Sequence, residues 1–186
     1  MMEKIVVLGG GESGCGAALL AQQKGFKVFL SDIGKIKEKY KNVLTHNAIE
    51  WEEEKHSVKR FFEADIIVKS PGIPDTIPLI QDLKKALVPI ISEIEFASRY
   101  TDAKIIGITG SNGKTTTTLL LGHMLKKAGL NVAVAGNVGE SFALQVANDS
   151  HDFYVLELSS FQLDGIDNFK PHIAILLNIT SDHLDR

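Results

Sequence analysis

Short runs of apolar residues recur along the chain, and most lead through a glycine-rich or polar turn into a segment with helical spacing. This alternation is typical of a parallel β-sheet whose strands are joined by crossover helices. The pattern predicts strands at residues 5–8, 27–30, 65–68, 89–91, 105–109, 131–135, 153–158 and 173–178. It predicts helices over residues 14–24, 76–87, 93–99, 114–128 and 141–147. The sequence therefore predicts an α/β protein.

Two glycine-rich loops divide this pattern, one after the strand at residues 5–8 and the other after the strand at residues 105–109. Because the chain starts a second α/β unit near residue 100, we expect a Rossmann-like parallel-sheet domain over residues 1–98 and a second domain over residues 99–186. The chain stops just after a predicted strand. We therefore expect the second domain to be truncated, since a nucleotide-binding sheet normally has further alternating elements.

The segment over residues 47–62 is charged and has no clear period. We expect Glu52 to Lys55 to form a solvated helix face without chemical function. Five histidines are expected at the surface, because a lone histidine outside a cluster is most often a surface residue. They are His46, His56, His123, His151 and His172.

The second loop, Thr109 to Thr117, reads TGSNGKTTT and lies between an apolar strand and an amphipathic helix. Glycines at such a turn let backbone N–H groups surround a phosphate, and the helix N-terminus adds partial positive charge. Lys114 could then reach the outer phosphates, and the Thr115 hydroxyl could bind Mg²⁺. The glycine spacing departs from the usual P-loop, because Ile108 stands where the first glycine is expected. A glycine-rich turn capped by threonines is the alternative interpretation.

Two further side chains follow apolar strands of the same unit. Glu157 ends the strand at residues 153–158, and His183 follows the strand at residues 173–178. An acid that is buried at a strand end is costly without a cation, which makes Glu157 a candidate Mg²⁺ ligand. Since the carboxyl ends of parallel strands meet at one edge, Lys114, Glu157 and His183 could face one another.

The first loop contains Gly9, Gly11 and Gly14 in a G-x-G-x-x-G pattern, and Asp32 ends the next strand. This is a dinucleotide fingerprint, but any nucleotide diphosphate would meet the same loop, so NAD is only one option. Ser13 could add a hydroxyl to a phosphate oxygen. The turn SPGIP, Ser70 to Pro74, follows the third strand on the same side of the sheet, where a structural turn and a ligand-binding role are equally plausible.

Composition narrows the class of protein. The formal net charge of -3 with mixed signs argues against a nucleic-acid partner. The start of the chain has no signal-peptide pattern, no apolar run is long enough to cross a membrane, and the single cysteine excludes an internal disulfide. A cytoplasmic protein without membrane insertion is expected.

With these residues together, the chain resembles the Mur ligase family, ATP-dependent enzymes that add amino acids to the peptidoglycan precursor. The resemblance rests on the TGSNGKTTT loop and on four further motifs in order, SPGI (Ser70 to Ile73), GNVG (Gly136 to Gly139), ELSSFQL (Glu157 to Leu163) and DHLDR (Asp182 to Arg186). Among the members, these motifs are most similar to those of the enzymes that add D-glutamate.

The resemblance implies that ATP phosphorylates the carboxylate of UDP-N-acetylmuramoyl-L-alanine, and that D-glutamate attacks the acyl phosphate. It implies catalytic roles for Lys114, Glu157 and His183, and a Mg²⁺ site made by Thr115, Glu157 and His183. The implied ATP site comprises Gly110, Ser111, Asn112, Gly113, Lys114, Thr115 and Thr116. The implied substrate-binding residues are Ser13, Asp32, Ser70, Pro71, Gly72, Asn137 and Ser159. The first loop would then bind UDP in place of NAD.

The chain departs from the family pattern in two places. Ile33 and Gly34 follow Asp32, where relatives often have threonine and arginine. The family's chain is over twice as long, so the third domain is expected to be absent and the chain to be unable to complete ligation alone; a full-length protein is expected to be monomeric. Another P-loop amide ligase such as a folylpolyglutamate synthase, a P-loop kinase, a nucleotide-binding module without catalysis and an NAD-dependent dehydrogenase are the alternatives.

Overall fold

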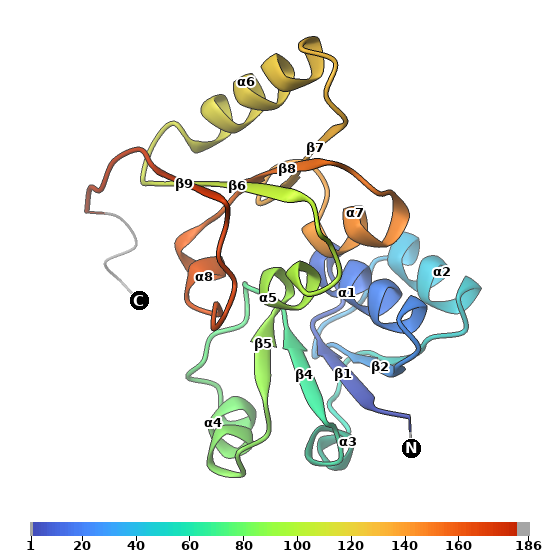
Figure 1. Ribbon diagram of the computed structural model, residues 1–186. Helices are drawn as coiled ribbons and strands as arrows, with labels where there is room; N and C mark the ends of the chain where they lie inside the picture. Colours follow the sequence, from blue (N-terminus) through green and yellow to red (C-terminus); the bar gives the residue numbers. More distant parts are fainter. Residues whose placement is uncertain (1, 182–186) are drawn as a thin grey trace.

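The computed structural model describes residues 2–181 and contains two β-sheets, in each of which neighbouring strands are parallel (Figure 1). The predicted α/β class is therefore confirmed. None of the helices in the described part of the chain combines the length and the apolar composition needed to cross a bilayer.

The first sheet has the strand order β3-β2-β1-β4-β5. Its strands are β1 (Lys4–Leu8), β2 (Lys27–Ser31), β3 (Glu50–Glu52), β4 (Ile66–Lys69) and β5 (Ile90–Ser92). The chain moves outward from β1 to β3 and then crosses to β4 on the opposite side of β1. The carboxyl ends of β1 and β4 therefore flank the crevice in which an open parallel sheet binds its ligand.

The second sheet has the order β7-β8-β6-β9. Its strands are β6 (Lys104–Thr109), β7 (Val132–Gly136), β8 (Phe153–Glu157) and β9 (Ile173–Leu176). The central strand β6 lies between β8 and β9, so the strand order reverses beside β6 and places a second crevice at its carboxyl end.

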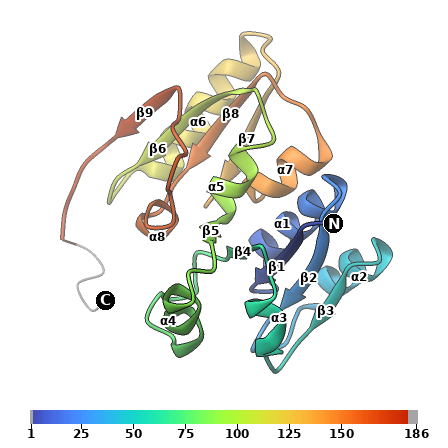
Figure 2. The ribbon, with the colours of Figure 1, turned by 60° about the horizontal axis from the view of Figure 1, so that its bottom comes forward.

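The helices cover the sheets in layers (Figures 1 and 2). They are α1 (Glu12–Gln23), α2 (Glu38–His46), α3 (Val58–Phe62), α4 (Pro78–Lys85), α5 (Glu93–Ser98), α6 (Lys114–Lys127), α7 (Phe142–Asn148) and α8 (Ser160–Leu163). Helices α3 and α4 pack on the outer face of the first sheet, and α6 packs on the outer face of the second. Helices α1, α5 and α7 lie between the sheets and share one core with both.

The contact between α1 and α7 joins the two sheets. A Cβ atom added to Gly16 of α1 would lie 2.5 Å from Oγ of Ser141 and 2.8 Å from the backbone nitrogen of Leu144. Since real Cβ atoms do not approach other atoms so closely, only glycine fits at this crossing.

Two carboxylates of the first unit bind the start of α7. Glu12 accepts a hydrogen bond from the backbone nitrogen of Ser141 at 3.0 Å, and Glu93 accepts one from the backbone nitrogen of Ala143. Glu93 is buried, and burial raises the pKa of its carboxyl to about 7, with the nearby charge of Glu12 adding to the shift and the hydrogen bond from Ala143 opposing it. The joint between the units therefore contains a carboxyl group that titrates near neutral pH.

The sequence pattern was wrong over the charged segment. Glu52 lies in the three-residue strand β3 rather than on a helix, and its side chain is buried. The hydrogen bonds described below satisfy that carboxylate, which is why it can leave water. The short elements α2, α3 and α8 were also not predicted, whereas the other strands and helices begin and end within a few residues of their predicted ranges.

Candidate functional site

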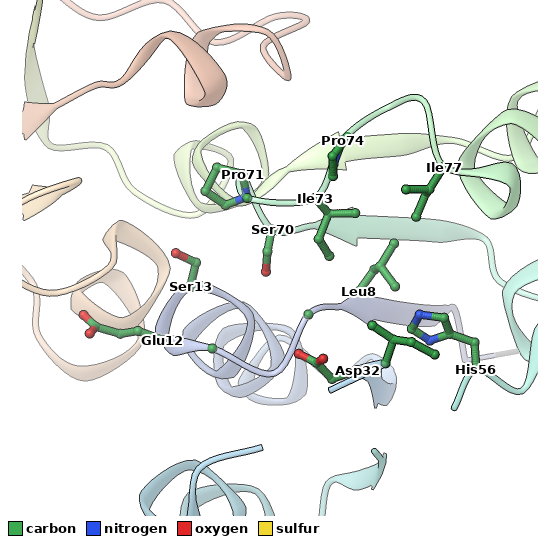
Figure 3. A pocket seen from close by; sticks show the side chains of 14 residues that line it. Leu8, Glu12, Ser13, Asp32, His56, Ser70, Pro71, Ile73, Pro74 and Ile77 are labelled. Atoms are coloured by element: carbon green, nitrogen blue, oxygen red, sulfur yellow. The ribbon is translucent and has the colours of Figure 1, made fainter. Parts of the chain in front are cut away.

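The first candidate site is a cavity of about 440 Å³ at the carboxyl ends of β1, β2 and β4 (Figure 3). Its lining includes five of the predicted substrate residues, namely Ser13, Asp32, Ser70, Pro71 and Gly72. Figure 3 shows Ser13 at one end of the cavity, His56 and Ile77 at the other, and Ser70 and Asp32 between them. The structure therefore brings these predicted residues to one pocket.

The glycine turn of this pocket is held by backbone contacts. Gly9 has φ of 108° and donates its N–H to the carbonyl of Ser31 at 2.9 Å. A Cβ atom on Gly14 would lie 1.8 Å from the carbonyl oxygen of Gly9, so the start of α1 lies directly against the turn. Close approach of this kind brings a helix N-terminus, with its unpaired N–H groups, up to the cavity.

Asp32 is tied to the backbone on both sides. One carboxylate oxygen accepts the N–H of Gly10 and the other accepts the N–H of Gly34 at 2.7 Å. Each oxygen keeps a second lone pair, which can accept a ligand hydroxyl. Across the cavity, the buried Oγ of Ser70 has no hydrogen-bond partner in the described part of the chain. Asp32 and Ser70 therefore offer polar groups to a ligand from opposite walls.

The SPGIP turn is fixed at its base by Lys69. Its ammonium group donates to the carbonyl of Ile73 at 2.6 Å and pairs with Asp75 at 3.0 Å. Because Lys69 is the last residue of β4, these contacts attach the turn rigidly to the strand. The turn lines the cavity, which favours the ligand-binding interpretation over a purely structural one.

His56 also lines this pocket, although the sequence pattern indicated a surface histidine. Its Nδ1 lies 2.7 Å from Oγ of Ser31, and that hydroxyl lies 2.8 Å from Oε1 of Glu52. Glu52 also accepts the backbone and side-chain groups of Ser57, both at 2.6 Å. Such a network depends on tertiary contacts, so no local sequence signal could identify it.

The second candidate site lies at the carboxyl end of β6 and is a cavity of about 300 Å³. It is lined by Gly110, Ser111, Lys114 and Ser159, among others. Lys114 starts α6, and its ammonium group donates to the carbonyls of Gly110 at 2.7 Å and Ser111 at 3.0 Å. The lysine thus binds its own loop and holds a positive charge at the centre of the turn.

A segment after β9 supports this loop from the other side. Asn178 accepts the backbone N–H groups of Ser111 and Asn112, through its carbonyl at 3.1 Å and its side chain at 2.8 Å. Ser111 donates its hydroxyl to the carbonyl of Thr180 at 3.1 Å. Sequence reasoning did not identify Asn178 or Thr180, and their position directly after an apolar strand was the available signal.

Glu157 lies on the strand next to this loop. The register pairs it with Ile108 of β6, two residues before Gly110. Its side chain is 1 % exposed, Oε1 accepts the side-chain amide of Asn137 at 2.6 Å, and Oε2 has no partner in the described residues. A buried carboxylate oxygen without a partner is costly, and a cation is a suitable partner for it, although Glu157 lies behind the residues that line the 300 Å³ cavity and not among them. The residues present therefore fit a divalent cation.

The other predicted residues fall around this second site. Asn112, Thr115 and Thr116 are exposed in or just after the loop. Ser159 caps α8, and its hydroxyl accepts the N–H of Gln162 at 3.3 Å. Asn137 and Ser159 thus lie with the second site and not with the first pocket. His183 lies outside the described residues, among which no group of three or more histidine, cysteine or acidic side chains is arranged to hold a metal ion.

Two family models match separate parts of the chain. The MurD N-terminal domain matches residues 4–77, and the Mur ligase middle domain matches residues 108–186. The chain is 61% identical over 186 residues to UDP-N-acetylmuramoylalanine--D-glutamate ligase of Christiangramia forsetii, and 62% identical over 185 residues to that of Bacteroides fragilis. Each match covers 100% of this chain and 42% of the relative. The chain thus spans less than half the length of these curated relatives.

Solved structures of the family share the fold. A UDP-N-acetylmuramate:L-alanyl-gamma-D-glutamyl-meso-diaminopimelate ligase from Neisseria meningitides matches with a TM-score of 0.66 and 24% identity, over 100% of this chain and 63% of that chain. UDP-N-acetylmuramate-alanine ligase from Thermotoga maritima matches with a TM-score of 0.61 and 25% identity, over 98% of this chain and 43% of that chain. This likeness shows the fold, and the family models and sequence matches confirm the resemblance found in the motifs: the chain belongs to the Mur ligase family.

Proposed function

We propose that residues 1–98 bind the UDP-linked substrate and residues 99–186 bind ATP in an enzyme that joins D-glutamate to UDP-N-acetylmuramoyl-L-alanine. The observation that carries this proposal is the register of Glu157 with Ile108, which puts a buried, half-paired carboxylate beside the Lys114 loop. The identity of about 60% to the D-glutamate ligases along the whole chain supports the choice of substrates.

In the proposed reaction, an oxygen of the substrate carboxylate attacks the terminal phosphorus of ATP, the bond to the bridging oxygen breaks, and ADP leaves. The amine nitrogen of D-glutamate then attacks the acyl carbon, the carbon–oxygen bond to phosphate breaks with its electron pair going to phosphate, and the amine releases a proton. Such a transfer requires mainly positioning and charge neutralisation from the protein.

Lys114 has the main role at the phosphates. Its ammonium group would exchange the carbonyls of Gly110 and Ser111 for the β- and γ-phosphate oxygens. The N–H groups in the first turn of α6 would donate to the same phosphates, whereas those of Ser111 and Asn112 already donate to Asn178. Thr115 and Glu157 would hold Mg²⁺, with His183 as a further ligand. The metal supplies neutralising charge on the phosphates when bound.

In the first pocket, the diphosphate would lie at the start of α1 beside Ser13, and Asp32 would accept a ribose hydroxyl. Ser70, Pro71 and Gly72 would form the opposite wall. Asn137 donates a hydrogen bond to Glu157 and would hold it in place, and Ser159, which lines the second cavity, would contact the substrate there. We place the enzyme in the cytoplasm, as a monomer at full length, without nucleic-acid partners or membrane insertion.

Calorimetric titration of the chain with UDP, NAD and Mg²⁺–ATP tests the two sites separately. We expect UDP and ATP to bind independently and NAD to bind more weakly than UDP. Lys114→Ala should weaken ATP binding about 10- to 100-fold, because it removes charged hydrogen bonds, and should leave UDP binding unchanged. Lys104→Ala, at the opposite end of β6, is the matched control. Unchanged ATP affinity in Lys114→Ala would contradict the proposed ATP site.

A test of which amino acid is the acceptor requires a protein of the relatives' full length. Its release of ADP should require both UDP-N-acetylmuramoyl-L-alanine and D-glutamate. Release that is supported equally by other amino acids would favour another amide ligase, and release without any acceptor would contradict the proposed reaction.

A further inference from the structure

His56 lies at the end of the first pocket that is farthest from the helix N-terminus. The opposite end holds Ser13 and the start of α1, where the diphosphate is placed under the proposed function (Figure 3). The cavity between them passes Asp32. A nucleotide that extends along this cavity from its phosphates therefore directs its base toward His56 and Ile77.

Two contacts fix the plane of the His56 ring. On one side Nδ1 lies 2.7 Å from the hydroxyl oxygen of Ser31. The ring also meets the buried ring of Phe61 edge to face, with centroids 5.5 Å apart and planes at 81°. In the described part of the chain no group hydrogen-bonds to the other ring nitrogen, Nε2. The imidazole is thus preorganised and has one nitrogen free.

The neighbours of Ser31 determine where the imidazole proton lies. Burial raises the pKa of Glu52, but hydrogen bonds from Ser57 and Ser31 outweigh this effect and hold that pKa below its usual range, so Glu52 is ionised and only accepts. The single hydroxyl proton of Ser31 has two acceptors, Oε1 of Glu52 at 2.8 Å and the carbonyl of Lys55 at 3.3 Å, and it goes to the nearer, charged one. The Ser31 oxygen is left as an acceptor for Nδ1–H, and Nε2 carries a lone pair.

The neutral form of His56 is favoured at neutral pH. Burial lowers the pKa of the imidazole below its ordinary value, while the charges of Glu52 and Asp32 oppose that shift only in part. A neutral histidine with its proton on Nδ1 is a hydrogen-bond acceptor at Nε2. Uracil carries a donor at N3, whereas cytosine carries an acceptor at the same position.

We propose that His56 determines base specificity in the first pocket, by accepting the N3–H of uracil at Nε2, and that Ser31 and Glu52 are positioning residues that hold its proton on Nδ1. This inference rests on the proposed binding of a uridine nucleotide. It adds a residue and a proton position that select uracil over cytosine. A cytosine ring would bring the lone pair of its N3 against the lone pair of His56 Nε2.

Calorimetry with UDP, CDP and the 5′-diphosphate of 3-methyluridine tests the proposal. The wild-type chain should bind UDP about tenfold or more tightly than either analogue, as expected for one hydrogen bond and one unpaired acceptor. His56→Gln and His56→Phe should bring the UDP-to-CDP ratio close to one, since glutamine can present either an oxygen or an NH₂ group and phenylalanine presents neither. His46→Gln, an exposed histidine of α2, is the matched control and should keep the wild-type ratio.

Nitrogen chemical shifts of the His56 ring provide an independent readout. In the nucleotide-free wild type they should show Nδ1 protonated and Nε2 unprotonated, and Ser31→Ala should mix the tautomers and lower the UDP-to-CDP ratio. Tight UDP binding with an unchanged ratio in both His56 variants would overturn this inference and leave the proposed function intact. A proton on Nε2 in the wild type would also overturn it. Failure of the wild type to bind UDP would overturn both.

Discussion

Each of the two glycine-rich loops follows the end of a strand, but the contacts that hold the loops and their neighbouring acids differ. In the first, the turn and helix touch through the backbone, Asp32 is bound on both oxygens, and the cavity wall is fixed by Lys69. In the second, Lys114 binds its own loop, and Glu157 keeps one buried oxygen without a partner. Each site therefore keeps one buried oxygen without a partner among the described residues, but in the first it is the neutral hydroxyl of Ser70 and in the second it belongs to the carboxylate of Glu157.

The two carboxylates therefore differ in how fully the protein satisfies them. A carboxylate that backbone N–H groups already satisfy is stable in place and can offer only its remaining lone pairs. A buried carboxylate with an unpaired oxygen costs free energy until a cation binds. Four predictions test this contrast, from the largest expected effect to the smallest.

Gly14→Ala should have the largest effect, because its Cβ would overlap the carbonyl oxygen of Gly9, which belongs to the backbone and cannot rotate away. We expect a loss of about 3 kcal/mol in the free energy of unfolding, measured by chemical denaturation. Gly11→Ala, in the same turn, has no atom within 4 Å of its added Cβ and should cost less than about 0.5 kcal/mol. Equal effects of the two changes would mean that the first loop is not held rigidly.

Glu93 makes the joint between the two regions sensitive to pH. Because its pKa is raised to about 7 in the folded chain from 4.5, the folded state binds more protons, and stability falls as pH rises from about 4.5 to 7. Glu93→Gln stays neutral, so the wild type should lose roughly 3 kcal/mol relative to this variant across that window.

Denaturation curves at several pH values measure this difference. Glu12→Gln removes a neighbouring charge that contributes to the shift and should reduce the loss in part. Parallel pH curves for the wild type and Glu93→Gln would contradict the prediction.

Asp32→Asn and Glu157→Gln should change stability with opposite signs. Asparagine would turn an NH₂ group toward a backbone N–H, and we expect a loss of about 1–3 kcal/mol. Glutamine at residue 157 removes charge from a buried site and should stabilise the ligand-free chain by about 1 kcal/mol. The same change should abolish the added stability that Mg²⁺–ATP gives the wild type, as thermal denaturation would show. A loss of stability in both variants would remove the contrast between the two acids.

Ser159→Ala should have the smallest effect. It removes the hydroxyl that caps α8 and one half of the capping box with Gln162, at a cost of about 1 kcal/mol. Hydrogen exchange at the α8 amides would detect this local loss. Ser160→Ala, a substitution at the exposed residue that follows, should leave the exchange rates unchanged. Faster exchange in both variants would show that the loss of the cap is not the cause.

The sequence predicted the strands that carry apolar runs, because burial on both faces of a parallel sheet leaves a clear pattern. It also predicted the two loops, whose glycines and lysine have a direct physical purpose. It failed at β3, where a three-residue strand buries Glu52, since a satisfied carboxylate looks the same in sequence as a solvated one. His56 was missed for the same reason, because Ser31 and Phe61 reach it only in the folded chain.

The glycine at the α1–α7 crossing has a consequence for how the chain can vary. Gly16 lines neither candidate site, yet any larger residue there would push α1 and α7 apart. The single methyl group added by Gly16→Ala should therefore weaken the contact between the two sheets without changing a residue of either candidate site.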